Sequence, residues 1–358
     1  MRLHVLPNPS GITHPDYRMD AFNIAVWKFT RHMQRLGHEV IHYGHESSAV
    51  DCEHITVVTN DDFAPPSPDW ACVHDPRLAD IFAQRAGPEL QRRVHDHDLV
   101  LSFYGNVHRS ITDLVRHRAA IVEPAIGYEV TGVYADFRGF TSQAWMHYYY
   151  GTRGMLMEPS WYDEVIPNAI TPGESRFDTD KSDYFMYIGR MVSTKGIALA
   201  IQVTQHLGQR LLIGSPGRLS HIGYDTVPPH VVELGYLGWR ERARLLSRAR
   251  GLFAPTHYIE PFGNVVAEAA MCGTPVITSD WGGFVDTVIP GVTGFRCRDF
   301  QGFVTAASSV AEIDPHICRD WALQEYSDDS VHHKFDRWFR KIQRRDFYQL
   351  YDDGKGSV

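Results

Sequence analysis

The chain has 358 residues, a hydrophobic fraction of 43% and a formal net charge of −8. This length exceeds one ordinary domain and suits two, each with its own core. The negative charge argues against a nucleic-acid-binding surface, and five scattered cysteines without a CxxC pair are typical of a reduced, cytoplasmic protein. No apolar run approaches the roughly 18 to 20 residues of a membrane span.

The first half of the chain opens as a β-α-β unit. Residues 2–6 form an apolar strand, residues 19–36 carry apolar side chains at helical spacing, and residues 39–43 begin a second strand. Gly11, in the loop after the first strand, is not part of a GxGxxG sequence, which argues against a dinucleotide-dependent dehydrogenase. Further strands are expected at residues 55–59, 98–102 and 119–122.

The middle of the chain joins two halves. Residues 127–150 are rich in aromatic side chains and are expected to form a loop and a helix. The polar stretch from Thr171 to Asp183, with a proline and a glycine, is typical of an interdomain linker. Although the chain has 20 histidines, neither the pair at 95 and 97 nor the pair at 332 and 333 has the spacing of a metal site.

The second half begins with a strand at 184–188, followed by Gly189-Arg190 and then Lys195-Gly196. Arginine offers a rigid pair of donors to phosphate oxygens, and lysine adds a mobile point charge beside it. The next strand, 211–213, ends at Gly214, and another ends at Tyr236.

The stretch from Ala254 to Phe295 contains two acidic residues, Glu260 and Glu268, separated by seven others. The turn Pro261-Phe262-Gly263-Asn264 between them precedes a short helix expected from Val265 to Met271. Unpaired amides and the helix dipole at that N-terminus would form an anion site between two carboxylates. This arrangement suits a nucleotide sugar, with its phosphates on the amides and its hydroxyls on the carboxylates.

The sequence E-P-F-G-x4-E-A-x2-C-G-T-P-V-I from Glu260 to Ile277 resembles the signature of retaining GT-B glycosyltransferases of the GT4 family, also called glycosyl transferases group 1. Gly189 to Gly196 matches that family's G-R-x4-K-G pattern. The resemblance implies an α/β GT-B fold of two Rossmann-like domains facing a cleft. We expect an acceptor domain at 1–171, a nucleotide-sugar domain at 172–325, and a helix at 326–350 that returns to the first domain.

The resemblance also implies roles for individual residues. Arg190 and Lys195 would stabilise the leaving diphosphate, Glu260 would contact the donor sugar, and Glu268 would contact the ribose. The expected donor-binding residues are Gly11, Gly189, Arg190, Lys195, Gly214, Tyr236, Glu260, Pro261, Phe262, Gly263, Asn264, Val265 and Glu268. Catalysis is assigned to Arg190, Lys195 and Glu260, with no metal and no cofactor.

One departure concerns the sugar side of the site. Many GT4 enzymes carry a His-Gly pair after the strand that here ends at Val122, whereas this chain continues Glu-Pro-Ala-Ile-Gly-Tyr-Glu. His108, Gly127 and Glu129 remain as candidates for contacts with the acceptor or the sugar.

The implied function is retaining transfer of a hexosyl group from a nucleoside diphosphate (NDP) sugar, with UDP-glucose as the model donor, to a hydroxyl acceptor. The acceptor is open among a small molecule, a glycan, a lipid and a modified DNA base. Two alternatives share the fold or the ligand. A GT-B epimerase or phosphorylase would not need this acceptor, and a non-catalytic binding module would hold nucleotide sugar without releasing nucleotide.

Overall fold

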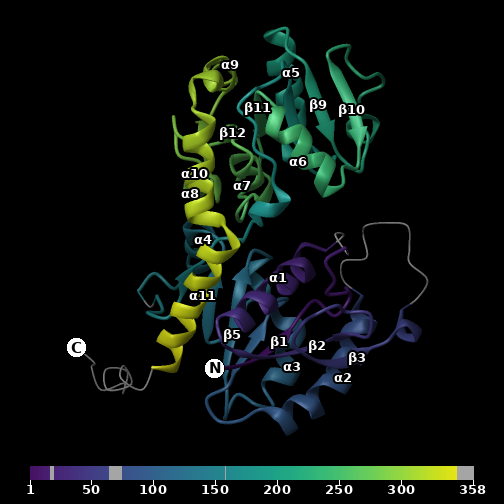
Figure 1. Cartoon of the computed structure of the whole chain (residues 1–358), viewed down its shortest axis with the longest axis vertical. Helices are drawn as coiled ribbons and strands as arrows, with labels where there is room; N and C mark the ends of the chain where they lie inside the picture. Colours follow the sequence, from purple (N-terminus) through teal and green to yellow (C-terminus); the bar gives the residue numbers. More distant parts are fainter. Residues whose placement is uncertain (17–19, 64–74, 158, 345–358) are drawn as a thin grey trace. The chain divides into compact units, whose positions relative to one another are not determined.

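The computed structural model describes residues 1–16, 20–63, 75–157 and 159–344, which fold into two compact units (Figure 1). Unit 1 contains Met1–Phe140, Tyr150–Ile166 and the chain from Val331 onward. Unit 2 contains Thr141–Tyr149 and Pro167–Ser330. Each unit is built on one parallel sheet with helices packed against it, so the expected α/β class is confirmed.

In its described residues, unit 1 has a seven-stranded parallel sheet in the order β3-β2-β1-β4-β5-β6-β7. The strands are β1 (Arg2–Leu6), β2 (Glu39–His45), β3 (Glu53–Val58), β4 (Leu99–Ser102), β5 (Ala120–Ile126), β6 (Phe137–Phe140) and β7 (Glu164–Val165). The strand order reverses between β1 and β4, which creates a switch point where ligands bind in such sheets. Within the stretch expected as an aromatic loop and helix, β6 was missed because Phe-Arg-Gly-Phe is too short to show alternation.

Helices cover both faces of this sheet. One face packs against α2 (Pro76–Arg93) and the short α3 (Arg109–Thr112) through a cluster that includes Phe82 and Ile121. On α1 (Ala21–Arg35), Phe29 meets Phe335 of α11 (Asp328–Gln343) with ring centroids 5.4 Å apart. The chain's last described helix therefore completes the core of its first unit.

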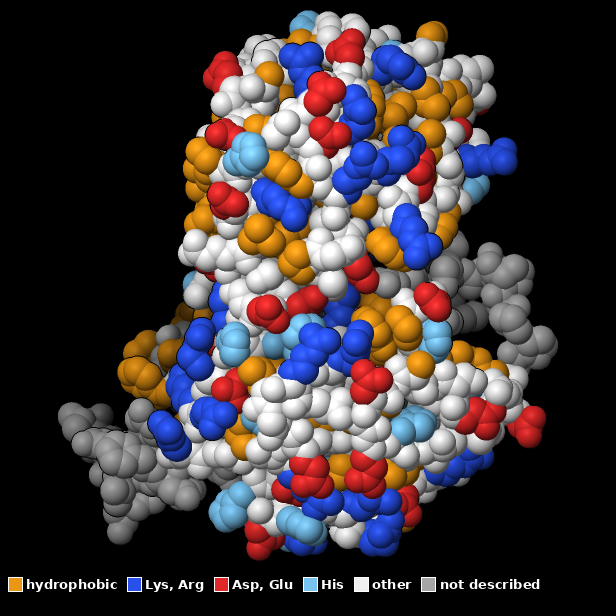
Figure 2. All heavy atoms as spheres, in the orientation of Figure 1, with side chains coloured by type: hydrophobic (Ala, Val, Ile, Leu, Met, Phe, Trp, Pro, Cys, Tyr) orange, Lys and Arg blue, Asp and Glu red, His pale blue; other side chains and the backbone are white. Residues whose placement is uncertain are grey.

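The helix expected at 326–350 corresponds to α11, and residues 345–350 lie outside the described part of the chain. Its Trp338 is buried and donates a hydrogen bond of 2.7 Å from Nε1 to the carbonyl of Tyr162. A side chain at Gly139 of β6 would lie 3.0 Å from the Trp338 ring, so the glycine makes room for it. The opposite face of α11 carries Lys and Arg side chains (Figure 2).

The described residues of unit 2 form a six-stranded parallel sheet in the order β10-β9-β8-β11-β12-β13. Its strands are β8 (Phe185–Ile188), β9 (Leu211–Gly214), β10 (Val231–Gly235), β11 (Gly251–Ala254), β12 (Val276–Ser279) and β13 (Gly294–Cys297). The order reverses between β8 and β11, which places the segments that follow these two strands at the switch point.

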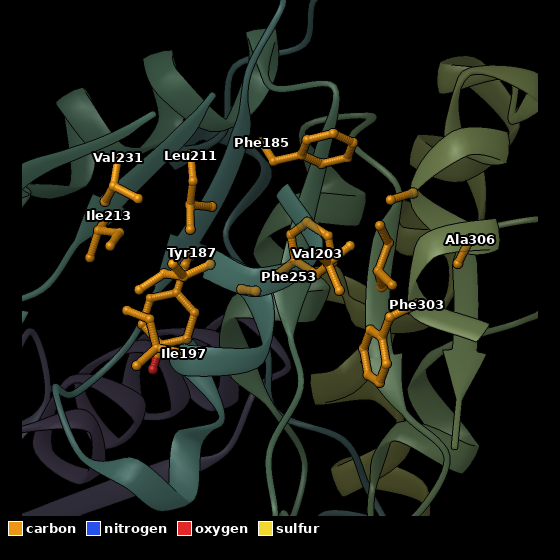
Figure 3. Close-up of a cluster of buried hydrophobic side chains, with 14 of the residues drawn as sticks. Phe185, Tyr187, Ile197, Val203, Leu211, Ile213, Val231, Phe253, Phe303 and Ala306 are labelled. Atoms are coloured by element: carbon orange, nitrogen blue, oxygen red, sulfur yellow. The ribbon is translucent and has the colours of Figure 1, made fainter. Parts of the chain in front are cut away.

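Two apolar layers enclose the sheet of unit 2. Figure 3 shows one of them, in which Phe185, Leu211 and Phe253 from the sheet lie with Val203 and Phe303 from helices. The helices of this layer are α5 (Ile197–His206) and α9 (Phe300–Ser309). The other layer packs α6 (Trp239–Arg248), α7 (Asn264–Met271) and α8 (Phe284–Thr287) against the sheet, and α10 (Pro315–Tyr326) lies against α7.

The domain limits expected from the sequence stay predictions. The contacts within the structure place a short segment of the first half of the chain in unit 2. The helix α4 (Gln143–Arg153) divides between the units, because residues Thr141–Tyr149 group with unit 2. The Thr141 hydroxyl donates to the carbonyl of Pro261 at 3.3 Å, and the Ala144 amide donates to Asp286 at 3.3 Å. Among the described residues, no helix is long and apolar enough to cross a membrane.

Candidate active site

Two segments at the switch point of unit 2 lie side by side. The loop after β8 carries Lys195, and the segment after β11 carries Glu260. The amide of His257 donates to the carbonyl of Thr194 at 2.8 Å, which ties one segment to the other. Residues 65 positions apart in the chain therefore share one site.

Gly196 allows this close approach. It has a φ of +73°, a left-handed conformation that glycine adopts without strain. A Cβ atom there would lie 1.8 Å from the carbonyl oxygen of Pro255. Any other residue would push the Lys195 loop away from β11, so the glycine of the expected G-R-x4-K-G pattern has a structural reason.

The carboxylate of Glu260 is held by two donors on the same oxygen. Lys195 Nζ lies 2.7 Å from Oε2, and the Tyr258 hydroxyl donates to Oε2 at 2.6 Å. The Lys195 ammonium also lies 4.9 Å from the centre of the Tyr258 ring, where cation–π attraction adds to the ion pair. The carboxylate therefore has a fixed orientation before any ligand binds.

The Tyr258 hydroxyl acts as a donor throughout the neutral pH range. Burial raises the pKa of Tyr258 well above its usual value, and the neighbouring Glu260 carboxylate raises it further. Trp281 fixes the segment from the other side, since its Nε1 donates to the carbonyl of Tyr258 at 3.1 Å.

The backbone of Glu260 is held by the turn Gly282-Gly283. The Gly283 amide donates to the Glu260 carbonyl at 2.6 Å. A Cβ atom at Gly282 would lie 2.7 Å from the Glu260 amide nitrogen, and one at Gly283 would lie 2.6 Å from the Pro261 carbonyl. Both glycines are needed because two backbones touch here.

The helix expected from Val265 to Met271 is confirmed as α7, which begins one residue earlier. Gly263 precedes it with a φ of +88° and turns the chain into the helix. The first-turn amides, those of Asn264 and Val265, have no acceptor four residues back and lie at the positive end of the helix dipole. These amides stand at the start of α7 as the sequence predicts, and anion binding there stays a prediction.

Two further side chains of this stretch make contacts within the unit. Phe262 is 3% exposed and packs against Tyr326, so its side chain belongs to the core, and its role in donor binding stays a prediction. Its apolar ring is more stable in the core beneath α7 than at a polar site. The side chain of Asn264 accepts a 2.7 Å hydrogen bond from Asn168, which joins the start of α7 to the segment after β7.

Glu268 lies one helical turn after Asn264 in α7, and its carboxylate forms an ion pair with an arginine of α6. Arg242 Nε of α6 lies 3.1 Å from Glu268 Oε2. The two glutamates of the motif are thus held by different partners, Glu260 by Lys195 and Glu268 by Arg242. Neither pairing is visible in the sequence, because each joins residues that are far apart in the chain.

The remaining expected donor-binding residues of unit 2 surround the same sheet edge. Gly189 follows β8 and Gly214 ends β9, and the Gly189 amide donates to the Gly214 carbonyl at 3.2 Å. Arg190 is exposed. Burial raises the pKa of Tyr187 and of Tyr258, and the positive charge of Arg190 lowers both by a smaller amount. Arg190 thus lies on the same loop after β8 that carries Lys195, while Tyr236 stands exposed after β10.

The other candidates belong to unit 1. Gly11 follows β1, and a Cβ atom there would lie 2.1 Å from Asn23 Nδ2 at the start of α1. His108 is fully buried, and its Nδ1 lies 2.9 Å from the Ser102 hydroxyl. Burial lowers the pKa of His108 to about 3, so its imidazole is neutral. Its roles in acceptor or sugar binding stay predictions.

Gly127 and Glu129 lie on the loop after β5, and a residue missed in the sequence anchors this loop. Glu123 of β5 is fully buried and accepts hydrogen bonds from the Tyr128 hydroxyl at 2.8 Å and from the amides of Tyr134 and Ala135 at 3.0 Å each. The exposed Glu129 is therefore carried by a loop fixed at both ends. A lone charged residue within an apolar strand was the available signal.

Burial raises the pKa of Glu123 to about 7, although its hydrogen bonds act in the opposite direction. Because the folded pKa lies above the unfolded one, the folded state binds more protons between pH 4.5 and 7. This contribution to stability is complete below about pH 4.5 and is lost as the pH rises through 7.

In the wild-type protein, the ionisation of Glu123, with a folded pKa of about 7, should lower the free energy of unfolding between pH 5 and 8. We expect Glu123→Gln to remove this part of the pH dependence, because the amide does not ionise. The isosteric amide can still bond to Tyr128 and to one or both amides. Urea unfolding of wild type and variant across this range measures the difference. Parallel pH curves for the two proteins would contradict the assignment.

Among the described residues, no group of three or more His, Cys, Asp or Glu side chains is placed to hold a metal ion. Lys195 and Arg242 bring positive charge to the two glutamates, and independence from a metal stays a prediction.

The two parallel-sheet, Rossmann-like units define the fold as that of GT-B glycosyltransferase structures. Sucrose-phosphate synthase from Thermosynechococcus elongatus matches 95% of this chain and 98% of its own, with a TM-score of 0.68 and 16% identity. Anabaena HepE in complex with UDP-glucose matches 95% of this chain and 99% of its own, with a TM-score of 0.67 and 13% identity. Likeness at these identities establishes the fold.

Sequence comparison adds a family match for unit 2. Residues 182–312 match the model of the family "Glycosyl transferases group 1", which includes the Lys195, Glu260 and Glu268 positions. Glycogen synthase from Mycobacterium tuberculosis is 38% identical over 142 residues, a match that covers 36% of this chain. The same match spans 34% of the length of that relative.

Proposed function

We propose that this protein is a retaining glycosyltransferase that transfers a hexosyl group from an NDP-sugar to a hydroxyl acceptor. The observation that carries the proposal is the Glu260 carboxylate, which Lys195 and Tyr258 hold at the switch point beside the start of α7. A cation, a fixed carboxylate and free helix amides together match a sugar diphosphate. The family match over residues 182–312 supports the same chemistry.

In this proposal the diphosphate lies on the first amides of α7, with Arg190 and Lys195 beside it. As the bond to the sugar breaks, negative charge builds on the leaving diphosphate, and fixed cations stabilise it most at that moment. Glu260 presents its carboxylate to the sugar, and Glu268 presents its own to the ribose. UDP-glucose is the first donor to test, because HepE was crystallised with it.

The bond between Lys195 and Glu260 gives the site a defined change on binding. A diphosphate would compete with the Glu260 carboxylate for the Lys195 ammonium, which leaves the carboxylate to accept hydrogen bonds from sugar hydroxyls. Tyr258 would keep Glu260 in place while Lys195 moves, because its hydroxyl donates to the same carboxylate.

The test is a screen of NDP-sugars for nucleotide release, each with and without candidate acceptors. The acceptor panel contains small-molecule alcohols, oligosaccharides, lipid carriers and DNA with a hydroxymethylated base. We expect one donor to release nucleotide faster with one acceptor class, and retained anomeric configuration in the product. Conversion of the donor alone to another sugar would instead identify an epimerase, and nucleotide binding without turnover would identify a binding module.

Tyr258 tests how Glu260 is positioned. We expect Tyr258→Phe to reduce kcat by about tenfold, the usual worth of one hydrogen bond to a charged group, with little change in the affinity for NDP. Steady-state kinetics and calorimetry with NDP measure the two effects. Tyr224→Phe, at a partly exposed tyrosine of the same unit, is the matched control. Equal loss of NDP affinity and kcat would contradict a role limited to positioning Glu260.

The absence of a metal requirement is also a prediction. Two cations and the helix amides can balance a diphosphate, so we expect turnover to persist in excess EDTA. Donor turnover is measured with EDTA, then with added magnesium or manganese. If EDTA abolishes turnover and either ion restores it, the enzyme requires a metal and the prediction is wrong.

A further inference from the structure

Three large apolar side chains of unit 1 are almost completely exposed. Leu156 is 81% exposed, Met157 is 91% exposed and Trp161 is 89% exposed. Among the described residues, no other large hydrophobic side chain exceeds 58%. Leu156 and Met157 follow the end of α4 and Trp161 precedes β7, so all three belong to one connection. Exposure of this extent costs solvation free energy that a partner surface would recover.

The base of this connection is rigid even though its tip is exposed. Asp163 accepts hydrogen bonds from Arg138 Nε at 2.9 Å and from the Tyr150 hydroxyl at 2.8 Å. The Met155 amide donates to the Tyr150 carbonyl at 2.9 Å. The polar groups near the base are paired, and the apolar side chains stand outside them. The exposed apolar side chains therefore lie beside a hydrogen-bonded base.

A row of basic side chains borders this connection. Exposed residues recur at helical spacing at His333, Arg337 and Arg340 of α11 and at Arg344 in the turn that follows it. Residues 331–344 contain five Lys or Arg and one acidic residue, in a chain whose formal net charge is −8. Figure 2 shows these basic side chains gathered along α11 beside a hydrophobic patch.

The connection and the helix are joined directly. Trp338, on the buried face of α11, donates to the Tyr162 carbonyl, next to Trp161. Lys341 lies 3.5 Å from Glu164 in β7, which follows the connection. The end of the connection that carries Trp161 is therefore joined to α11 within unit 1.

We propose that this surface, Leu156, Met157 and Trp161 with the exposed basic row of α11, binds an anionic lipid bilayer. Tryptophan, leucine and methionine insert at the boundary between head groups and acyl chains, and a row of cations attracts anionic head groups. Residues in a straight row on a helix suit a planar surface, and their positive charge stands out from an acidic protein. Arg340 of this row pairs with Asp336 at 2.9 Å, much as Arg31 of α1 pairs with Asp51, so α11 is chosen over α1 because the exposed apolar side chains adjoin it.

The test is cosedimentation of the full chain with vesicles of phosphatidylcholine, alone or mixed with phosphatidylglycerol. We expect binding to the mixed vesicles to be about tenfold tighter or more, because each cation near an anionic surface adds to affinity. Rising salt should weaken it. Failure of the wild-type protein to bind the mixed vesicles would overturn the proposal.

Two sets of variants separate the apolar and basic contributions. Leu156→Ser, Met157→Ser and Trp161→Ser combined should abolish binding, whereas the control set Val227→Ser, Phe300→Ser and Ile317→Ser, at exposed positions of unit 2, should not. Arg337→Glu with Arg344→Glu should remove the preference for phosphatidylglycerol, and Arg92→Glu with Arg109→Glu, which changes charge equally on unit 1, should keep it.

Thermal unfolding shows whether each variant is folded, and exposed positions should leave the melting temperature unchanged. Full binding by the triple-serine variant, or equal loss in its control, would overturn the assignment. Analytical ultracentrifugation measures the oligomeric state of the wild-type protein and of the triple-serine variant. A wild-type dimer that the triple-serine change dissociates would assign this surface to a second copy of the chain and overturn the lipid proposal.

Discussion

Glu260→Gln is expected to lower kcat by about 10²- to 10³-fold, the loss typical of a preorganised charged contact to the reacting group. The affinity for free NDP should not fall. The amide removes the charge that meets the sugar in the transition state, but it also releases Lys195 from an ion pair of 2.7 Å. Steady-state kinetics and calorimetry with NDP give the two quantities.

Glu268→Gln is the comparison for this result, and Glu312→Gln, at an exposed glutamate of unit 2, is the matched control. The ribose is present in substrate and product nucleotide alike, so its contact contributes uniform binding. Glu268→Gln should therefore raise the donor KM and weaken NDP with a smaller effect on kcat. If Glu260→Gln weakens NDP while Glu268→Gln does not, the roles are reversed.

Lys195→Ala is expected to weaken NDP binding by about 10- to 100-fold, as a charged hydrogen bond is worth about 1.5–3 kcal/mol, and to slow transfer further. Arg190→Ala should act in the same direction. Arg298→Ala, which removes an exposed arginine of unit 2, is the control. Calorimetry measures the affinities, and unchanged NDP affinity in both variants would remove Arg190 and Lys195 from the phosphate site.

Because Lys195 and Glu260 are in contact, we expect the effects of Lys195→Ala and Glu260→Gln on kcat not to be additive. Removal of the lysine leaves Glu260 with Tyr258 as its remaining described donor on Oε2. Because the two side chains share a bond, the double variant should lose less kcat than the product of the single losses. Strict additivity would mean that the ion pair does not couple the two groups during turnover.

Much of the candidate site could be predicted from the sequence because its parts are local. The strand before Gly189, the turn at Gly263 and the helix that follows are each specified by neighbouring residues. The parallel sheet then brings the carboxyl ends of β8 and β11 together, so residues on separate motifs converge.

The remaining features depend on contacts between distant residues. The pairing of Glu268 with Arg242 joins α7 to α6, and neither helix carries a signal for the other. The burial of Phe262 against Tyr326 likewise depends on a helix that lies far along the chain, so the motif alone does not show where this side chain packs. Glu123 was overlooked for a different reason, since its donors come from backbone amides that any residue could supply.

The divided helix α4 has a consequence for exchanging halves between related proteins. The chain passes between the units at residues 140, 149, 166 and 330, so neither unit is encoded by one continuous stretch of gene. A chimaera joined only at residue 166 would take residues 141–149 from the wrong parent. The hydroxyl of Thr141 and the amide of Ala144, which bond to Pro261 and Asp286, would then meet a foreign surface. Recombination that preserves the donor site therefore needs a junction before Thr141, one within α4 after Tyr149, one after Ile166 and another before Val331.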